Sequence, residues 1–195
     1  MIRKQLRPAI VATFLLCALT GLVYPGIVTA LAQALFPRQA NGSLVTVDGR
    51  VVGSALIGQP FTRPEYFHPR PSAAGTSYDA AASAGTNKGP TDRKLADTLI
   101  GGRADSLIAA GVARRGEIPT DMVTASASGL DPHVSPANAA LQVPRVARAR
   151  GVPTERVRAV LAAHTEGRQF GVFGEPRVNV LLLNVALDSA FGRKP

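Results

Sequence analysis

The side chains with catalytic potential are scattered through this sequence instead of gathered at the spacing that chemistry requires. His68, His133 and His164 lie in three unrelated contexts, with no cysteine or paired carboxylate at ligand spacing beside them. A zinc site needs three or four such ligands around one ion. We therefore expect no metal site in this chain.

Two motifs that would indicate a hydrolase or a nucleotide triphosphatase are incomplete. Ser126 and Ser128 precede Gly129 but do not complete G-x-S-x-G in any frame. Residues 85–89 lack the spacing and the terminal Lys-Ser/Thr of a P-loop. We expect no catalytic residue and no cofactor of the chain's own.

Small polar residues beside glycine and proline are better suited to fixing turns than to catalysis. Their hydroxyl, amide and carboxylate groups bind nearby backbone readily, and no activating base lies at a recognisable spacing. We predict this structural role for six residues: Ser126, Ser128, Gly129, Asp131, Asn179 and Asn184.

Residues 140–163 carry a local pattern that suggests a binding function. They read as helix, glycine turn and helix, with arginines on both helices, which is the outline of a helix-turn-helix. One interpretation is a membrane-tethered DNA-binding regulator. The other is an αα-hairpin that packs its Val and Leu faces on the core. We favour the hairpin, and no nucleic-acid partner, because Pro144 is awkward within the first helix and the membrane orientation predicted below places the domain outside the cytoplasm.

Residues 58–90 hold too many prolines and glycines for a regular element. They nevertheless contain four of the seven aromatic residues that follow residue 37, which a solvated linker would not carry. The segment either packs onto the core or is presented to a partner. For the partner-binding alternative we single out four residues: Tyr66, Phe67, Arg70 and Ser72.

The N-terminal segment has the length of a membrane-spanning helix. Residues 8–37 carry no charged side chain, and the apolar run 9–36 would extend roughly 40 Å as a helix, more than the ~30 Å hydrocarbon core requires. A cleaved signal peptide is the alternative, since small residues around Ala32 have the form of a cleavage site. The run exceeds a signal core of about 7 to 15 residues, so we favour a retained single-pass anchor.

The charges that flank this helix predict its orientation. Three basic residues precede it, whereas only Arg38 and Arg50 follow closely. Positive residues gather on the cytoplasmic side of a membrane. We therefore expect three parts: a cytoplasmic N-terminus at 1–8, a transmembrane helix at 9–36 and a soluble extracytoplasmic domain at 37–195.

The part after residue 37 is large enough for one mixed domain. It keeps 19 basic and 13 acidic side chains, a mild excess for a nucleic-acid binder. Asp48-Gly49 between β-branched runs indicates a hairpin at 43–55. The other predicted elements are helices within 91–115, 136–150, 153–165 and 184–191, and strands at 119–124 and 178–183. This order indicates an α+β fold.

Several ordered motifs together are more specific than any one of them. They comprise GSALIGQ at 53–59, YFHPRPS at 66–72, VTASASGLD at 123–131, QVPRVA at 142–147, VNV at 178–180 with Asn184, and Leu187-Asp188. In this arrangement behind one N-terminal apolar helix, the chain resembles the C subunit family (KdpC) of Kdp potassium-transporting P-type ATPases. The resemblance covers nearly the whole chain.

The resemblance implies a non-catalytic accessory subunit of an ATP-driven potassium uptake complex in the bacterial plasma membrane. Its implied partners are a channel-like potassium-binding subunit, a P-type ATPase subunit, a small single-helix subunit and the lipid bilayer. The family is described as a catalytic chaperone that raises the ATP affinity of the pump subunit, with Gln142 and Arg145 proposed to contact the nucleotide. An extracytoplasmic domain could not reach cytoplasmic ATP, so we favour roles in assembly and at the outer potassium entrance.

Overall fold

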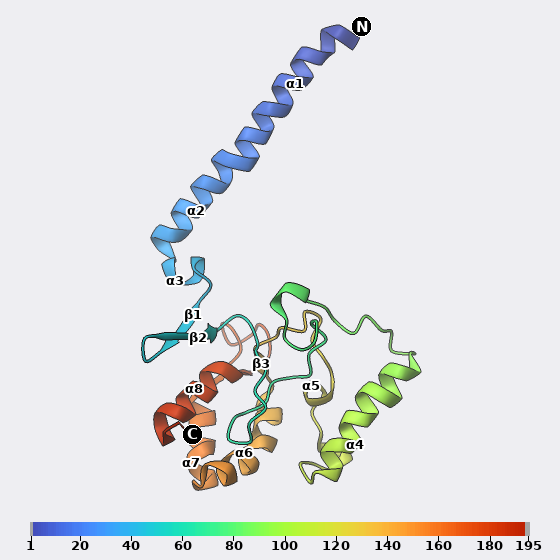
Figure 1. Ribbon diagram of the computed structural model, residues 1–195, viewed down its shortest axis with the longest axis vertical. Helices are drawn as coiled ribbons and strands as arrows, with labels where there is room; N and C mark the ends of the chain where they lie inside the picture. Colours follow the sequence, from blue (N-terminus) through green and yellow to red (C-terminus); the bar gives the residue numbers. More distant parts are fainter. Residues whose placement is uncertain (1, 194–195) are drawn as a thin grey trace. The chain divides into compact units, whose positions relative to one another are not determined.

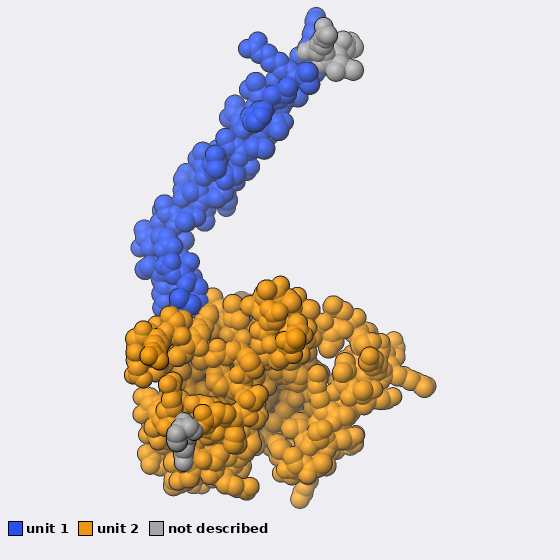
Figure 2. Space-filling model, in the orientation of Figure 1, with its two compact units in different colours: residues 1–44 blue, residues 45–195 orange. Residues whose placement is uncertain are grey.

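The computed structural model describes residues 2–193, and the chain divides into two compact units, residues 1–44 and 45–195 (Figure 2). The first unit is almost entirely helical (Figure 1). Its elements are α1 (Ile2–Ala18), the π-helical turn η1 (Leu19–Val23), α2 (Tyr24–Leu35) and α3 (Pro37–Ala40).

Within the described residues, one helix in this unit is long and apolar enough to cross a membrane, Lys4–Leu35. Its 32 residues extend about 48 Å at the rise of an α-helix. Pro25 does not break the helix, because the preceding turn is widened and the Tyr24 N–H donates to the carbonyl of Leu19. The predicted single N-terminal helix is confirmed, and it continues through the proline.

The second unit combines short strands with helices, which confirms the predicted α+β class (Figure 1). Its elements are β1 (Leu44–Val47), β2 (Arg50–Ser54), η2 (Ala80–Ala82), η3 (Lys94–Gly101), α4 (Gly102–Ala109), η4 (Arg115–Glu117), α5 (Thr120–Val123), β3 (His133–Val134), α6 (Pro136–Arg150), α7 (Thr154–Ala163), β4 (Thr165–Glu166), β5 (Arg177–Asn179) and α8 (Val180–Phe191). The β1–β2 pair is the hairpin expected around Asp48-Gly49, and both turn residues have positive φ.

A three-stranded sheet of order β3-β5-β4 joins segments that are far apart in the sequence. Both pairs are antiparallel, with His133 opposite Asn179 and Thr165 opposite Val178. The inner face of the central strand is fully buried at Val178. This sheet therefore fixes the start of α8 beside the chain that leads into α6.

The core lies between α6, α7, α8 and the small sheet. Apolar side chains from all of these elements form one buried cluster: Phe67, Val134, Ala139, Val143, Val146, Ala147, Val157, Leu161, Val178, Val180, Leu183 and Leu187. Each buried Val, Leu or Phe side chain of this cluster stabilises the fold by about 1.5–3 kcal/mol when it leaves water. Phe67 is the member that comes from the irregular segment 58–90.

Residues 140–163 form the hairpin of α6 and α7, as the favoured interpretation predicted. Ser135 caps α6 by accepting from the Asn138 N–H, and Gly151 ends it with φ +67°. The valines and Leu161 of the two helices enter the core. Arg150 is also buried and hydrogen-bonded within the domain, so this basic side chain is not accessible to nucleic acid.

One predicted strand is wrong and another extends too far. The strand predicted at 119–124 is replaced by the short helix α5 at Thr120–Val123, because Pro119 fixes an extended backbone directly before a first helical turn. The strand predicted at 178–183 ends at Asn179, whose side chain accepts from the Leu182 N–H and so caps a helix. The Val and Leu run that follows therefore belongs to α8, which starts four residues earlier than predicted.

Candidate functional site

The long segment 58–90 is fixed against α6 and α8 by side chains that bind its backbone. Asn184 on α8 accepts from the Phe67 N–H at 2.8 Å and donates to the Phe67 carbonyl at 3.0 Å. Both residues are buried. The amide thereby replaces the hydrogen bonds that an irregular chain would otherwise leave unmade in the core, and the Phe67 ring is held in place.

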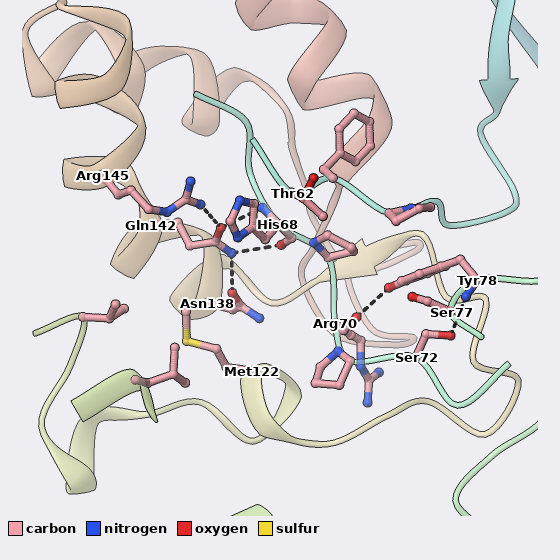
Figure 3. A pocket seen from close by; sticks show the side chains of 16 residues that line it. Thr62, His68, Arg70, Ser72, Ser77, Tyr78, Met122, Asn138, Gln142 and Arg145 are labelled. Carbon is pink, nitrogen blue, oxygen red and sulfur yellow. Dashed lines mark hydrogen bonds between the residues drawn. The ribbon is translucent and has the colours of Figure 1, made fainter. Parts of the chain in front are cut away.

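Gln142 on α6 repeats this arrangement one residue further along. It accepts from the His68 N–H at 2.8 Å and donates to the His68 carbonyl at 3.0 Å (Figure 3). Its amide also donates to Asn138 at 2.8 Å, while its oxygen accepts from Arg145 at 2.6 Å. The groups of Gln142 are therefore fully used within the domain.

Arg145 binds the same loop from the next turn of α6. One nitrogen of its guanidinium donates to the carbonyls of Pro64 at 2.6 Å and Tyr66 at 3.0 Å. Burial, together with the charge of Arg145, lowers the pKa of His68 below its usual range. His68 is thus kept neutral where a second positive charge would be unfavourable.

An ion pair between the buried Arg150 and the partly buried Asp188 supports the loop from the other side. Arg150 donates to Asp188 at 2.8 Å and to the Glu65 carbonyl at 2.8 Å. The Tyr66 hydroxyl donates to the same carboxylate at 2.9 Å, and its ring lies 5.2 Å from the Arg150 guanidinium carbon. Burial and hydrogen bonding to Asp188 raise the pKa of Tyr66, so this hydroxyl stays a donor at neutral pH.

The middle of the loop is tied to the turn before β3. Arg70 donates to Asp131 at 2.9 Å, and Ser72 donates to the Gly129 carbonyl at 2.7 Å. Burial alone would raise the pKa of Asp131, but hydrogen bonds from His133 and Arg70 outweigh it and lower that pKa below its usual range. This carboxylate is therefore ionised and serves as an anchor.

Of the six residues that we predicted to fix turns, Ser126, Ser128, Gly129 and Asp131 lie in the irregular stretch before β3, whereas Asn179 caps α8 and Asn184 lies within α8. Gly129 has φ +69°, and a Cβ there would approach the Ala84 carbonyl oxygen to 2.6 Å, so only glycine fits. The other five accept hydrogen bonds from nearby or facing backbone N–H groups, as follows: Ser126 from Gly129, Ser128 from Leu130, Asp131 from His133, Asn179 from Leu182 and Asn184 from Phe67.

A cavity of about 490 Å³ opens beside the side chains that bind the loop 58–90 (Figure 3). One wall is the loop, a second is α6, and a third comes from the segment that contains α4 and α5. Its lining residues are Pro60, Phe61, Thr62, His68, Pro69, Arg70, Pro71, Ser72, Ser77, Tyr78, Leu107, Val112, Met122, Asn138, Gln142 and Arg145. The cavity brings Arg70 and Ser72 of the predicted partner-binding set together with Gln142 and Arg145.

The four loop residues predicted to bind a partner have different surroundings. Phe67 is fully buried, so its side chain serves the core. Tyr66, Arg70 and Ser72 are partly exposed but bonded to Asp188, Asp131 and Gly129. Their contact with a partner stays a prediction. Within residues 2–193, no three His, Cys, Asp or Glu side chains lie close enough to hold a metal ion.

The sequence did not predict several of the residues whose side chains hold the loop in place, namely Asn138, Arg150, Asp188 and Tyr78. A signal for the first was present: Asn138 and Gln142 stand four residues apart, on the helix face that also carries buried Ala139, Val143 and Val146. Polar residues on an otherwise apolar helix face must find partners. The identity of those partners depended on the fold.

Comparisons with known proteins match almost the full chain. The family model described as K+-transporting ATPase, c chain (KdpC) matches residues 6–189. A Gemmatimonas aurantiaca protein named Potassium-transporting ATPase KdpC subunit is 62% identical over 193 residues, covering 98% of this chain and 96% of the relative. Proteins of the same name from Sorangium cellulosum and Nitratidesulfovibrio vulgaris are each 58% identical over 187 residues, covering 95% of this chain and 98% and 94% of the relatives.

Proposed function

Because the chain belongs to the KdpC family of K+-transporting ATPase subunits, we propose that it is an assembly subunit acting from outside the cytoplasm in a bacterial potassium uptake complex. Like its relatives it is an accessory subunit and not the catalytic one. The observation that carries the proposal is the family match over residues 6–189, which spans both the apolar helix and the domain.

The anchor supports a place in the plasma membrane. The Lys4–Leu35 helix can cross a bilayer by its length and composition, and the basic residues before it favour a cytoplasmic N-terminus. We propose that the domain then assembles with a channel-like potassium-binding subunit, a P-type ATPase subunit and a small single-helix subunit. Its position would be at the outer entrance for potassium.

The geometry of residues 58–90 supports a bracing role. Side chains on α6 and α8 already fix this loop, so little conformational freedom is lost when the domain binds another protein. A rigid body on a membrane anchor is well suited to hold neighbouring subunits in register. The domain would thereby stabilise the assembled complex without taking part in the chemistry.

An effect on the ATP affinity of the pump subunit would then be indirect. Gln142 and Arg145 form hydrogen bonds with His68, Asn138, Pro64 and Tyr66. Few of their hydrogen-bonding groups are therefore left to contact a nucleotide. We propose that any rise in ATP affinity comes through the assembled complex. Gln142→Leu should then weaken the domain's stability and the complex's ATPase activity in parallel.

A topology measurement tests the extracytoplasmic placement. Alkaline phosphatase, which is active only outside the cytoplasm, is fused to the C-terminus of the full chain in a bacterial host. We expect an active reporter, and an inactive phosphatase with an active cytoplasmic reporter in its place would contradict the proposal. That result would reopen direct ATP contact and the DNA-binding alternative.

Co-purification tests the assembly role. The full chain carries an affinity tag and is expressed with the other subunits of its operon in a strain that lacks its own potassium uptake complex. We expect the tagged chain to recover the other subunits, and omission of this chain to reduce their recovery as a complex. Recovery of the tagged chain alone would contradict the proposed function.

A further inference from the structure

The turn between β4 and β5 presents three apolar side chains to solvent. Phe170, Val172 and Phe173 are 85%, 68% and 66% exposed. They follow one another within four residues of a projecting turn, so they form one apolar patch. Clustered exposed apolar side chains of this kind mark interaction sites, whereas single ones are ordinary.

The backbone of this turn is ordered by its own hydrogen bonds. Gln169 and Phe173 exchange N–H to carbonyl bonds of 2.8 and 2.9 Å, and the Gly171 N–H donates to the Arg168 carbonyl at 3.0 Å. Phe170 has φ +53°, a left-handed conformation that is unusual for a bulky residue. The turn therefore holds its rings outward even though the conformation is unfavourable and no core is gained.

The charges at the base of the turn are balanced. Arg168 donates to both carboxylate oxygens of Glu175 at 2.8 and 2.7 Å, and Arg177 donates to Glu166 at 2.9 Å. An anionic lipid surface attracts loops with an excess of basic residues, and this base has none. A rim of paired charges instead suits a protein surface that carries both signs around an apolar centre.

We propose that residues 167–176, here called the docking tip, insert Phe170, Val172 and Phe173 into an apolar depression on another subunit of the same ATPase complex. The proposal rests on the proposed function, since that complex supplies the partner. The pre-ordered turn lowers the ordering cost of binding. The two ion pairs at the base of the turn would form a polar border on one side of the apolar contact.

The first test compares two double variants of the full chain, each co-expressed with the other subunits. Phe170→Ser with Phe173→Ser removes the apolar patch, and Val51→Ser with Leu56→Ser is the matched control, because those residues are 60% and 61% exposed elsewhere on the domain. We expect the tip variant to lower the yield of intact complex at least tenfold and the control to lower it less than twofold. Equal yields, or equal losses, would overturn the assignment.

A thermal melt of each purified chain in detergent keeps this test interpretable. Exposed apolar residues contribute little to folding, so both variants should melt within a few degrees of the wild-type chain. If the tip variant melts far lower, its lost assembly reflects misfolding and the structural basis of the proposal is wrong.

The second test identifies the occupant directly. A photo-crosslinking amino acid replaces Val172 in the intact complex, still in its membrane. A crosslink to another protein subunit supports the proposal, whereas crosslinks to lipid, to a second copy of this chain, or to nothing overturn it.

The assembly yields distinguish failure of the docking tip from failure of the proposed function. If the wild-type chain assembles but the tip variant assembles equally well, only the docking tip fails. If the wild-type chain does not assemble, the proposed function fails.

Discussion

Two neighbouring stretches of the domain differ in how firmly the rest of the structure holds them, and the difference is not one of regular secondary structure. Residues 58–90 have almost no helix or strand, yet they place Phe67 and Ala74 in fully buried positions. Residues 94–109 form the consecutive helices η3 and α4, in which no residue is buried. Burial and paired backbone groups, and not helicity, fix a segment in this protein.

The chemical reason lies in where the hydrogen bonds run. Helices η3 and α4 bond within themselves, so their backbone needs nothing from the core. The irregular loop cannot do so, and it obtains its bonds from Asn184, Gln142, Arg145 and Arg150. The loop is thus coupled to global folding, whereas the helical segment is free to open by itself.

The largest expected effect comes from removing the loop's buried ring. Phe67→Ala should lower the free energy of unfolding by about 3–5 kcal/mol, because it leaves a cavity in the core. The matched change Leu99→Ala in η3 should cost less than about 1 kcal/mol, since Leu99 is only partly buried. Urea unfolding of the full chain in detergent, followed by circular dichroism, measures both, and similar losses would break the comparison.

A somewhat smaller effect is expected from removing the amide that binds the loop. Asn184→Leu keeps a similar volume but leaves the N–H and the carbonyl of Phe67 unpaired in the core, at a cost of about 2–4 kcal/mol. Ser106→Ala on α4 also deletes a side-chain bond to a backbone carbonyl, but on an exposed helix it should cost under about 0.5 kcal/mol. The same urea unfolding measurement gives both changes in the free energy of unfolding. A negligible loss for Asn184→Leu would show that the loop is not held by this amide.

The same contrast explains what the sequence could predict. The apolar length of the N-terminal helix, the Asp48-Gly49 turn and the Ser135-Pro136 start of α6 are local signals, and each element formed as expected. The class of the fold followed from their order. The secondary structure of a segment whose hydrogen bonds are satisfied locally can therefore be predicted from that segment's own sequence.

The side-chain hydrogen bonds that hold the loop could not be predicted from local sequence in this way. Phe67 and Asn184 are 117 residues apart in the sequence, and no local pattern pairs them. The run after Asn179 looked like a strand because of its Val and Leu content, but the cap at Asn179 and burial on all sides made it a helix. The exposed rings of the docking tip were overlooked for the same reason, since exposure is a property of the fold.

A third prediction concerns pH and Asp131, which anchors the loop through Arg70. Its pKa is lower in the folded chain than in the unfolded chain, so the unfolded chain takes up a proton at a higher pH than the folded chain does. The stabilisation is fully present above the pKa of the unfolded chain and is lost as the pH falls through the pKa of the folded chain. Asp131→Asn should thus cost about 1 kcal/mol near neutral pH and nothing in stronger acid.

Unfolding curves from about pH 6 to about pH 2.5 measure this difference between wild type and Asp131→Asn. Arg70→Met removes one of the donors that lower the pKa of Asp131, so it should shrink the pH-dependent part of the stability without abolishing it. A difference that stays constant down to the lowest pH would show that the charge of Asp131 does not hold the loop.

The smallest expected effect tests the helical side of the comparison. Gly102 begins α4 with helical dihedral angles, and a Cβ there meets nothing within 4 Å. Gly102→Ala should therefore stabilise the helix by up to about 1 kcal/mol. Gly151 also has open space around it, but its φ is +67°, so Gly151→Ala should destabilise the fold by about the same amount.

Hydrogen exchange separates these two glycines by where their effects appear. If residues 94–109 open independently of the core, Gly102→Ala should slow exchange up to about fivefold in that segment only, because the stabilisation acts on a local opening. Gly151→Ala lies at the end of a helix that belongs to the core, so it should speed the exchange of buried amides in α6 and α8 together. Slowing by Gly102→Ala that spreads equally to α6 would mean that the exposed helices unfold with the core, and the distinction between the two stretches would no longer hold.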